Sequence, residues 1–156
     1  MSEVKLIGYW QRRIDPKKGR KFDPRVEAAL DSKLWAPYVE LAQYPWPGDL
    51  VDESFWKKYD KDSVVEYLKK NPTCNFYRGM ARCRLCDTAL SSCERSDGIW
   101  CWPDMLEHYI TEHDVRLPVE FVEHARISLI YDSLGQYDSL GQIKVNDSFW
   151  VDWTKK

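Results

Sequence analysis

The sequence predicts an α+β fold: a single compact domain that contains a ββα zinc-stapled unit and has a helical N-terminal half. A chain of 156 residues with 44% hydrophobic and 14% aromatic residues is long and apolar enough to bury a core of its own. Helical spacing of apolar residues recurs within residues 1–73. Residues 74–126 contain two cysteines and two histidines spaced as in a metal site, and 127–156 form a C-terminal extension.

The region before residue 73 shows two helical segments separated by a break. Residues 24–36 place apolar side chains at helical spacing, and the proline that opens this segment suits the first turn of a helix. The stretch YPWPGD at 44–49 is rich in Pro and Gly, which interrupt regular structure. Asp62 or Ser63 is placed to cap a second helix, which the Asn-Pro pair at 71–72 would end.

Two similar hexapeptides, VDESFW at 51–56 and VNDSFW at 145–150, combine turn-forming residues with a Phe-Trp pair. Because paired aromatics are usually buried, we expect each to be a capped turn that directs two aromatic side chains into the core. The second copy leads into FWVDW, which places Phe149, Val151 and Trp153 at alternate positions. This alternation predicts a final strand.

The sequence YDSLGQ occurs twice in succession, at 131–136 and at 137–142. Gly and Asp favour turns, which indicates a mobile loop or a β-hairpin. Apolar residues from position 127 onward also fit the period of a helix. The pattern leaves loop, hairpin and helix open.

Cys83, Cys86, His108 and His113 form the pattern C-x2-C-x21-H-x4-H. In a C-x-x-C segment one tight turn brings two thiolates to the same ion, and two imidazoles can complete a tetrahedron around zinc. The gap between the two pairs is longer than the ~12–15 residues usual in a nucleic-acid-binding finger. We predict that these four side chains bind one Zn²⁺ ion.

The residues between the two pairs of ligands predict the ββα arrangement. SDGIWCW at 96–102 places an Asp-Gly turn before an alternating strand, and Pro103 suits the first position of a helix that runs to His113. The core face of that helix holds Leu106, Tyr109, Ile110 and His113. His108 lies about 140° from His113 around the helix axis. Both histidines can therefore bind one ion only if the last turn of the helix departs from regular helical geometry.

Two alternatives to this set of ligands stay open. Cys101 or Cys93 could replace one histidine, although Cys101 lies between two tryptophans and suits a small buried apolar residue. Cys83 and Cys86 could form a redox pair, but no βαβ pattern surrounds them as a thioredoxin-like protein would require. His124 has no matching partner in the pattern, and we expect either a surface histidine or one that is satisfied by hydrogen bonds.

Residues 77–125 resemble a group of uncharacterised small bacterial proteins. The resemblance rests on YRGMARCRLC, SDGIWCWPDMLEHY and HDVRLPVEF. The pattern of the group is C-R-x-C, then D-G-x-W-x-W-P-E-G-L-x-H-Y, then H-x-V-R-L-P-x-E-F. Asp104 and Met105 replace the Glu-Gly of that pattern and leave the cysteine and histidine positions intact. The resemblance covers about a third of the chain and implies a zinc-finger-like Cys2His2 site without an assigned activity.

Composition and charge limit the classes of function. A formal net charge of −2 and a sequence pI of about 5.9 lack the basic excess of a typical nucleic-acid binder. No stretch approaches the ~18 apolar residues of a membrane span, and the N-terminus lacks the pattern of a signal peptide. Five cysteines, an odd number, favour reduced thiols or metal ligands over disulfides. We therefore expect a cytoplasmic protein without membrane segments.

Four ligands in one stretch predict a closed, structural zinc site, because a catalytic zinc keeps one position open. We therefore expect a zinc-binding protein-interaction module with a protein partner, in the manner of an inhibitor or an immunity-type protein. A zinc-dependent hydrolase is the first alternative; it requires a missing ligand, with Glu107 or Glu112 as general base. Weak RNA or phosphate binding is the second alternative, because three arginines at 78–84 lie near Tyr77.

Overall fold

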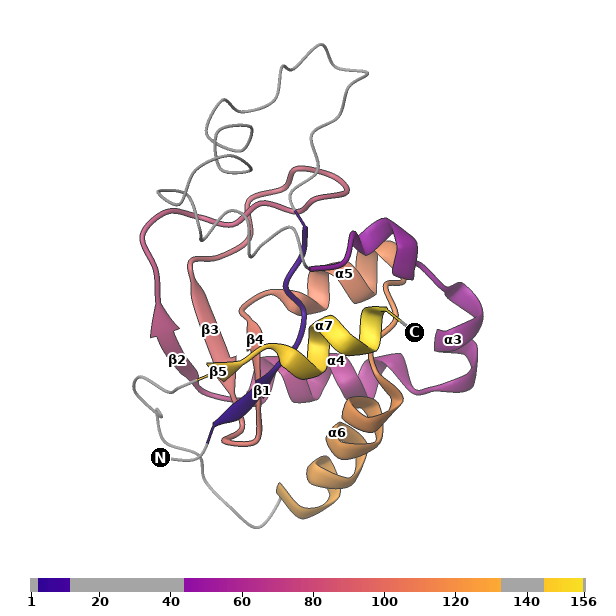
Figure 1. Ribbon diagram of the computed structural model, residues 1–156. Coiled ribbons are helices and arrows are strands. Elements are labelled where there is room, and N and C mark those ends of the chain that lie inside the picture. Colours follow the sequence, from indigo (N-terminus) through magenta and orange to yellow (C-terminus); the bar gives the residue numbers. More distant parts are fainter. Residues whose placement is uncertain (1–2, 12–43, 133–144, 156) are drawn as a thin grey trace.

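A curled five-stranded sheet forms the centre of the molecule (Figure 1). The structure is a computed structural model, and it describes residues 3–11, 44–132 and 145–155. The strands are β1 (Val4–Leu6), β2 (Thr73–Phe76), β3 (Cys93–Ser96), β4 (Trp100–Pro103) and β5 (Val145–Asn146). They lie in the order β2-β3-β4-β1-β5. Strands β2, β3 and β4 pair antiparallel, whereas β1 pairs parallel with both β4 and β5.

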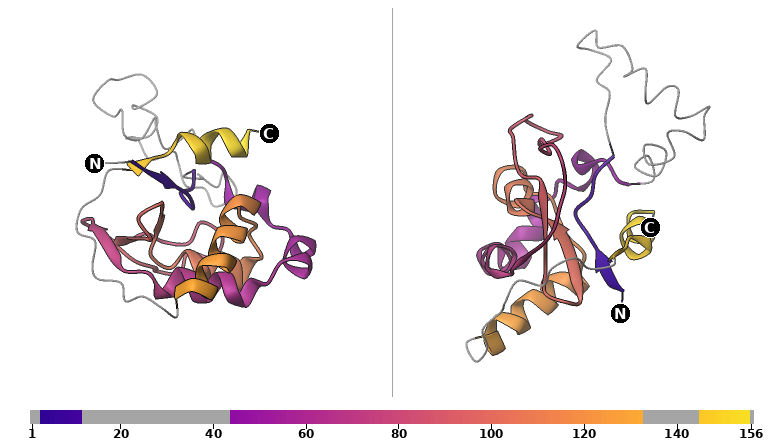
Figure 2. Two further views of the ribbon diagram at one scale, coloured as in Figure 1. Left: turned by 90° about the horizontal axis from the view of Figure 1, so that it is seen from below. Right: turned by 90° about the vertical axis from the view of Figure 1, so that its left-hand side faces the viewer.

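Helices lie on both sides of the sheet. Those in the described residues are α3 (Glu53–Lys58), α4 (Lys61–Lys70), α5 (Leu106–His113), α6 (Val119–Asp132) and α7 (Ser148–Thr154), with a 3-10 turn at Pro47–Leu50. Helix α4 packs against α5 and α6, and α7 packs along β1. Figure 2 shows α7 on the opposite side of β1 from α4 and α5. The mixed helix and sheet of a single small domain confirm the predicted α+β class at this level.

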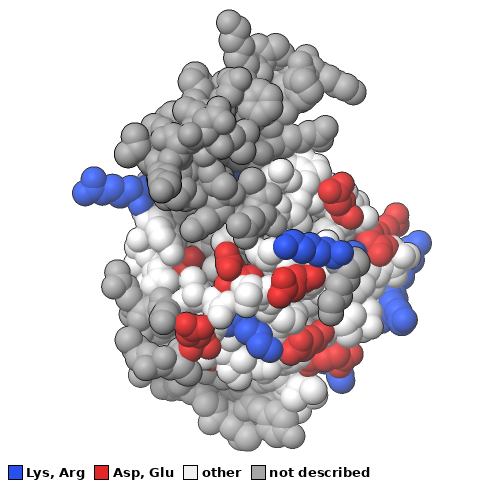
Figure 3. All heavy atoms as spheres, in the orientation of Figure 1, with Lys and Arg blue, Asp and Glu red and all other residues white. Residues whose placement is uncertain are grey.

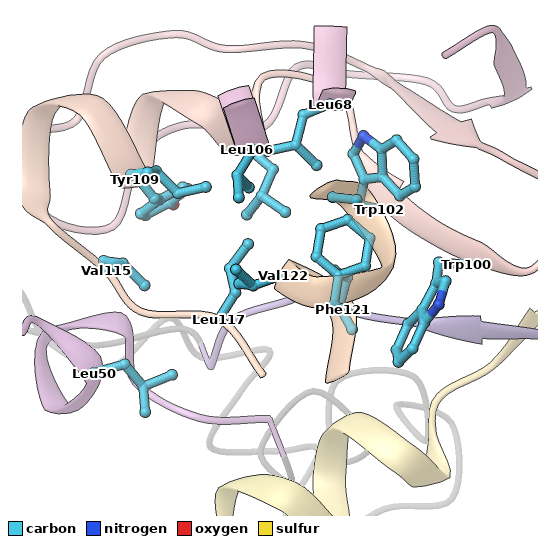
Figure 4. Packing of buried hydrophobic residues seen from close by; sticks show 14 of the residues in the cluster. Leu50, Leu68, Trp100, Trp102, Leu106, Tyr109, Val115, Leu117, Phe121 and Val122 are labelled. Atoms are coloured by element: carbon cyan, nitrogen blue, oxygen red, sulfur yellow. The ribbon is translucent and has the colours of Figure 1, made fainter. Parts of the chain in front are cut away.

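Two tryptophans of β4 lie at the centre of the core (Figure 4). Trp100 and Trp102 are buried, and both meet Phe121 of α6 edge to face, with ring centroids 5.4 and 5.6 Å apart. Tyr67 of α4 packs against Trp102 at 6.0 Å. Aromatic pairs of this kind contribute about 0.5–1.5 kcal/mol each beyond the area that they bury. These contacts attach the sheet to α4 and α6.

Helix α4 confirms the second helix that the sequence predicts, although it begins earlier than expected. Its N-cap is Asp60, whose carboxylate accepts hydrogen bonds from the backbone N–H of Ser63 at 3.3 Å and from its hydroxyl at 2.6 Å. Asn71 is the C-cap, so the Asn-Pro pair ends the helix as predicted. Asp60 replaces Asp62 as the cap because its side chain reaches the free N–H groups of the first turn from outside the helix.

The two similar hexapeptides each form the predicted turn, and each turn leads into a short helix that was not predicted. Asp52 caps α3 by accepting a hydrogen bond from a backbone N–H of its first turn. Asn146 Oδ1 accepts one from the N–H of Ser148 where α7 begins. Trp56 and Trp150 are both buried. Each turn therefore directs a tryptophan into the core.

The final strand predicted over Phe149, Val151 and Trp153 is wrong, because these residues belong to α7. Trp150 and Val151 are consecutive and both are buried, whereas a strand with a single buried face would expose one of them. Trp153 stacks on Trp150 one helical turn away, with ring centroids 5.2 Å apart. This contact at i, i+3 is available only in a helix.

Two predictions fall partly or wholly outside the described residues. The first predicted helix, at 24–36, lies outside them. The repeated YDSLGQ begins within α6, which ends at Asp132, and the rest of both copies, 133–142, lies outside. In the part of the chain that the structure describes, no helix has the length and apolar character needed to cross a membrane.

The predicted helix start at Pro103 is also wrong. Pro103 is the last residue of β4 and pairs with Glu94 of β3. The next backbone N–H, that of Asp104, still donates to the carbonyl of Cys93 at 2.9 Å, so the β3–β4 hairpin continues past the proline. Met105 then turns the chain at a φ of 70°, and α5 begins after it.

Met105 adopts a left-handed backbone conformation that only glycine adopts without strain. We expect Met105→Gly to raise the free energy of unfolding by about 1 kcal/mol, because the relieved strain of ~1–3 kcal/mol exceeds the ~0.4–1 kcal/mol that the flexibility of glycine costs. Urea denaturation measures the change. Met80→Gly, at an exposed position without a positive φ, is the control and should not stabilise the chain. A Met105→Gly variant that is less stable than the wild type would contradict backbone strain at Met105.

Candidate metal centre

The chain between β2 and β3 forms a narrow turn that carries the first two predicted ligands (Figure 1). Arg82 and Ala89 form an antiparallel bridge at its base. The N–H of Cys83 donates to the carbonyl of Thr88 at 2.8 Å, and the N–H of Leu85 donates to the Sγ of Cys83 at 3.4 Å. A backbone N–H directed at the sulfur stabilises the thiolate form, which is the form that binds metal.

Helix α5 carries both histidines and is attached to the cysteine turn. His108 lies in its first turn, and His113 is its last residue. The hydroxyl of Tyr109 accepts a hydrogen bond from the backbone N–H of Arg84 at 3.0 Å. Asp114 ends the helix in a left-handed conformation directly after His113. The Tyr109 contact holds the helix against the C-x-x-C turn, so that its two imidazoles face the two thiols.

The structure brings the four predicted ligands together. Each of Cys83, Cys86, His108 and His113 offers one ligand atom that lies within 4.8 Å of the other three. The Sγ of Cys86 is 3.2 Å from Nε2 of His108, and the two imidazole centroids are 5.3 Å apart. Ligand atoms of a tetrahedral zinc site lie about 3.3–3.8 Å apart, given Zn–S bonds of ~2.3 Å and Zn–N bonds of ~2.0 Å. A small contraction of this Cys/His group would therefore hold a metal ion.

His113 Nε2 is the atom of the group that most needs a partner. It is buried, and it has no hydrogen-bond partner among the residues that the structure describes. A buried polar nitrogen without a partner costs about 1–3 kcal/mol. A metal ion at the centre of the group would satisfy it. Two thiols and two imidazoles are a donor set that fits Zn²⁺.

The two thiols differ in their tendency to ionise. Burial raises the pKa of Cys83. Hydrogen bonds with Thr88, and then the contact with His113, lower the pKa of Cys86 to about 7. Cys86 is therefore the more readily ionised thiol of the pair, and the thiolate is the form that binds metal.

Neither of the alternative cysteines lies with this group. Cys101 is fully buried on β4, as predicted for a small apolar residue, and its Sγ lies 3.5 Å from Glu94 of β3. Cys93 contacts Ser91 and Asp104 instead. The geometry therefore gives no support to the replacement of a histidine ligand by either cysteine.

Sequence patterns missed a second group of potential ligands in the sheet. Cys74, Glu94 and Cys101 also have ligand atoms within 4.8 Å of one another. They come from three different strands, β2, β3 and β4. No short motif links residues that only the pairing of strands brings together, whereas the spacing of a C-x-x-C is visible in the sequence.

Comparison with models of protein families, with curated proteins and with solved structures finds no match for this chain. The resemblance of residues 77–125 to small bacterial proteins therefore stays a prediction. The chemistry of the site has to be inferred from its own geometry.

His124 is satisfied by hydrogen bonds, which was one of the two expectations for it. Its Nε2 lies 2.7 Å from Oδ2 of Asp97 and 3.3 Å from the hydroxyl of Tyr67. The other carboxylate oxygen of Asp97 accepts hydrogen bonds from the backbone N–H groups of Ile99 and Trp100, at 2.8 and 2.6 Å. Asp97 thus joins the β3–β4 turn to α4 and α6.

This arrangement predicts a loss of stability in acid. Burial of Asp97, whose side chain is 3% exposed, acts to raise its pKa, but the hydrogen bonds from His124, Trp100 and Tyr67 outweigh burial and hold the pKa below its usual value. A carboxyl group with a lower pKa in the folded state stabilises the fold above its unfolded pKa, and this contribution is lost as the pH falls through the folded pKa. We therefore expect the free energy of unfolding to decrease below about pH 4.

Urea denaturation at a series of pH values measures this dependence. Asp97→Asn should flatten the decrease below about pH 4. Glu66→Gln, at an exposed position on α4, should leave it close to that of the wild type. If Asp97→Asn and the wild type lose stability equally as the pH falls, another carboxylate is responsible.

Proposed function

We propose that this chain is a zinc-binding protein-interaction module in which Cys83, Cys86, His108 and His113 hold one structural Zn²⁺ ion. The observation that carries the proposal is the buried Nε2 of His113, which has no partner within the described ranges and lies beside two thiols and a second imidazole. Zinc bound there would join the C-x-x-C turn to α5 and contribute its binding free energy to folding.

The number of ligands supports a structural ion over a catalytic one. A catalytic zinc is usually held by three protein ligands and keeps its fourth position for water, whereas four protein side chains are available here. Glu107 is buried, and the charged groups that act on it are those of Asp104, Lys69 and Arg95. Glu112 is exposed on α5. These placements give little support to either glutamate as a general base at the metal.

An exposed apolar surface lies where the chain leads from β2 into the cysteine turn. Phe76, Tyr77 and Met80 are 70%, 55% and 60% exposed. We refer to these three residues as the Phe76–Met80 surface. Exposed aromatic and methionine side chains that gather in one segment are typical of protein-binding surfaces. The proposed zinc ion would hold the adjacent turn, and with it this surface, in one conformation.

The charged residues that follow the Phe76–Met80 surface in the sequence give less support to RNA binding than to protein binding. Arg82 forms an ion pair with Asp87, with 3.1 Å between Nε and Oδ1, and the guanidinium of Arg84 donates to the carbonyl of Arg82. On the face shown in Figure 3, Lys and Arg are scattered among Asp and Glu. A surface that binds the phosphate backbone gathers basic side chains instead.

Site-specific photo-crosslinking tests the proposed partner class. A photoreactive amino acid in place of Met80 should crosslink to a protein in cells, and the purified partner should then bind the intact chain in calorimetry. The double variant Phe76→Ser, Met80→Ser should bind that partner at least about tenfold more weakly, which corresponds to ~1.4 kcal/mol. Val119→Ser removes an exposed apolar side chain from α6 and should bind like the wild type.

Two other results would replace this proposal. Zinc-dependent hydrolysis of a substrate that Glu112→Gln abolishes would identify an enzyme. Binding of a single-stranded RNA oligonucleotide that Arg78→Ala weakens, in the absence of any protein partner, would identify an RNA-binding protein.

A further inference from the structure

A buried group of potential ligands lies in the sheet, separate from the four-residue site. Cys74, Glu94 and Cys101 are 2%, 2% and 0% exposed. Cys101 pairs with Ser96, which lies two residues along β3 from Glu94, so their side chains share one face of the sheet. Cys74 comes from β2 on the other side of β3, and its Sγ completes a group whose ligand atoms all lie within 4.8 Å of one another.

Hydrogen bonds hold the carboxylate of Glu94 in one orientation. The hydroxyls of Tyr9 and Tyr77 both donate to Oε1, the latter at 3.0 Å, and the side-chain amide of Asn75 donates to Oε2 at 2.7 Å. The thiol of Cys101 is the remaining contact, at 3.5 Å from Oε2. Since each carboxylate oxygen accepts two hydrogen bonds well, Oε1 is saturated, whereas Oε2 presents one lone pair to a weak thiol donor.

Among the residues that the structure describes, none supplies a cation to the buried carboxylate of Glu94. Within the described ranges, the groups that contact Glu94 are neutral, and no lysine, arginine or histidine forms an ion pair with it. The adjacent Arg95 pairs with Asp104 instead, with 2.6 Å between Nε and Oδ1. Buried carboxylates are costly without a counter-charge, and proteins usually pair them with a cation or a metal ion.

We propose that Cys74, Glu94 and Cys101 bind a second divalent, thiophilic cation of the zinc class. On binding, each thiol releases its proton to solvent, two metal–sulfur bonds and one metal–Oε2 bond form, and no oxidation occurs. Two thiolates and a carboxylate oxygen are ligand types that zinc accepts. The three protein ligands leave the fourth position of a tetrahedron for a solvent molecule. An open fourth position is usual for a catalytic zinc, but these three ligands are buried in the sheet, out of reach of a substrate, so the proposed ion is structural and ties β2, β3 and β4 together.

The groups around the carboxylate fit this role. Tyr9, Tyr77 and Asn75 keep their hydrogen bonds when the metal replaces the thiol contact at Oε2. Hydrogen bonds of this kind, to the oxygens of a ligating carboxylate, fix its orientation in established metal sites. Tyr9 follows β1 and Tyr77 follows β2, so two segments far apart in the sequence position the same ligand.

Elemental analysis of the intact chain, purified without a metal-affinity tag, tests the proposal by counting metal in four proteins. We expect two ions per wild-type chain, one in Cys101→Ala and one in Cys83→Ser. The matched control Cys93→Ser, at a cysteine outside both groups, should keep two. If Cys101→Ala keeps the full wild-type content while Cys83→Ser loses all metal, the second site does not exist. Loss from Cys101→Ala with no change in Cys83→Ser would support the sheet site and count against the Cys2His2 site.

Cobalt titration of the metal-free wild-type chain tests the same proposal without relying on variants that fail to fold. Thiolate-to-cobalt charge-transfer absorption should rise until two equivalents are bound, because each site contributes two thiolates. Saturation at one equivalent, with the same absorption from Cys101→Ala, would overturn the proposal and leave Glu94 as a hydrogen-bonded structural carboxylate.

Discussion

Replacing Cys83 by serine is expected to remove the zinc ion that we propose for the Cys2His2 group and to lower the free energy of unfolding by about 4 kcal/mol or more. A ligand that binds only the folded chain, at a thousand times its dissociation constant, stabilises the fold by about 4 kcal/mol. Cys83 is a buried residue of the cysteine turn. The hydrogen bond from the backbone N–H of Arg84 to the hydroxyl of Tyr109 attaches this turn to α5. Loss of this thiolate therefore leaves the imidazoles without an ion and weakens the attachment of the turn to the helix.

Thermal and urea denaturation, with and without a strong chelator, measure this effect. The chelator should lower the stability of the wild type to that of untreated Cys83→Ser or below, because it removes the ion that the variant lacks together with the ion proposed for the sheet. His113→Ala should behave like Cys83→Ser, whereas Cys93→Ser should stay close to the wild type, since Cys93 lies outside the group. Equal stability of Cys83→Ser and the wild type would exclude a structural role for the group.

Truncation of Trp102 is expected to destabilise the chain by about 3–5 kcal/mol, the usual cost of replacing a buried tryptophan by alanine. Trp102 is fully buried on β4 and contacts Phe121 of α6 and Tyr67 of α4. Trp102→Ala therefore opens a cavity where the sheet meets both helices. Urea denaturation followed by far-UV circular dichroism measures the change without relying on tryptophan fluorescence.

Trp102→Phe is the matched variant for the same position. The indole Nε1 of Trp102 is buried and has no hydrogen-bond partner among the described residues. Phenylalanine keeps an aromatic ring for the contact with Phe121 and removes the unpaired donor, whose burial costs about 1–3 kcal/mol. We expect Trp102→Phe to remain within about 1.5 kcal/mol of the wild type. Equal destabilisation by Phe and Ala would mean that the indole makes a polar contact.

The candidate zinc site could be predicted from the sequence because its ligands are paired locally. A C-x-x-C places two thiols in one turn, and two histidines five residues apart in one short helix have imidazoles close enough to share one ion. What the spacing alone could not provide was the attachment of the turn to the helix, which depends on the hydrogen bond between Tyr109 and the backbone of Arg84. The Cys74–Glu94–Cys101 group left no motif, because the register of three strands creates it.

The errors in the fold have a common cause, which is that contacts outside the recognised local pattern outweighed that pattern. Alternation at Phe149, Val151 and Trp153 is compatible with a strand, but stacking of Trp153 on Trp150 favours the helix. Pro103 suits the first turn of a helix, but the β3–β4 ladder continues through Asp104 and delays α5. The partner that decided the outcome lies one helical turn away in the first case and on the neighbouring strand in the second.

Anomalous diffraction at the zinc absorption edge, from crystals of protein purified without a metal-affinity tag or added zinc, would locate the proposed ion directly. We predict a peak about 2.3 Å from Sγ of Cys83 and Cys86 and about 2.0 Å from an imidazole nitrogen of His108 and of His113. For His113 that nitrogen should be Nε2, the buried atom for which the described part of the chain supplies no hydrogen-bond partner. A map with no peak between these four side chains, or with His113 turned away from a peak held by the cysteines, would contradict the closed structural site.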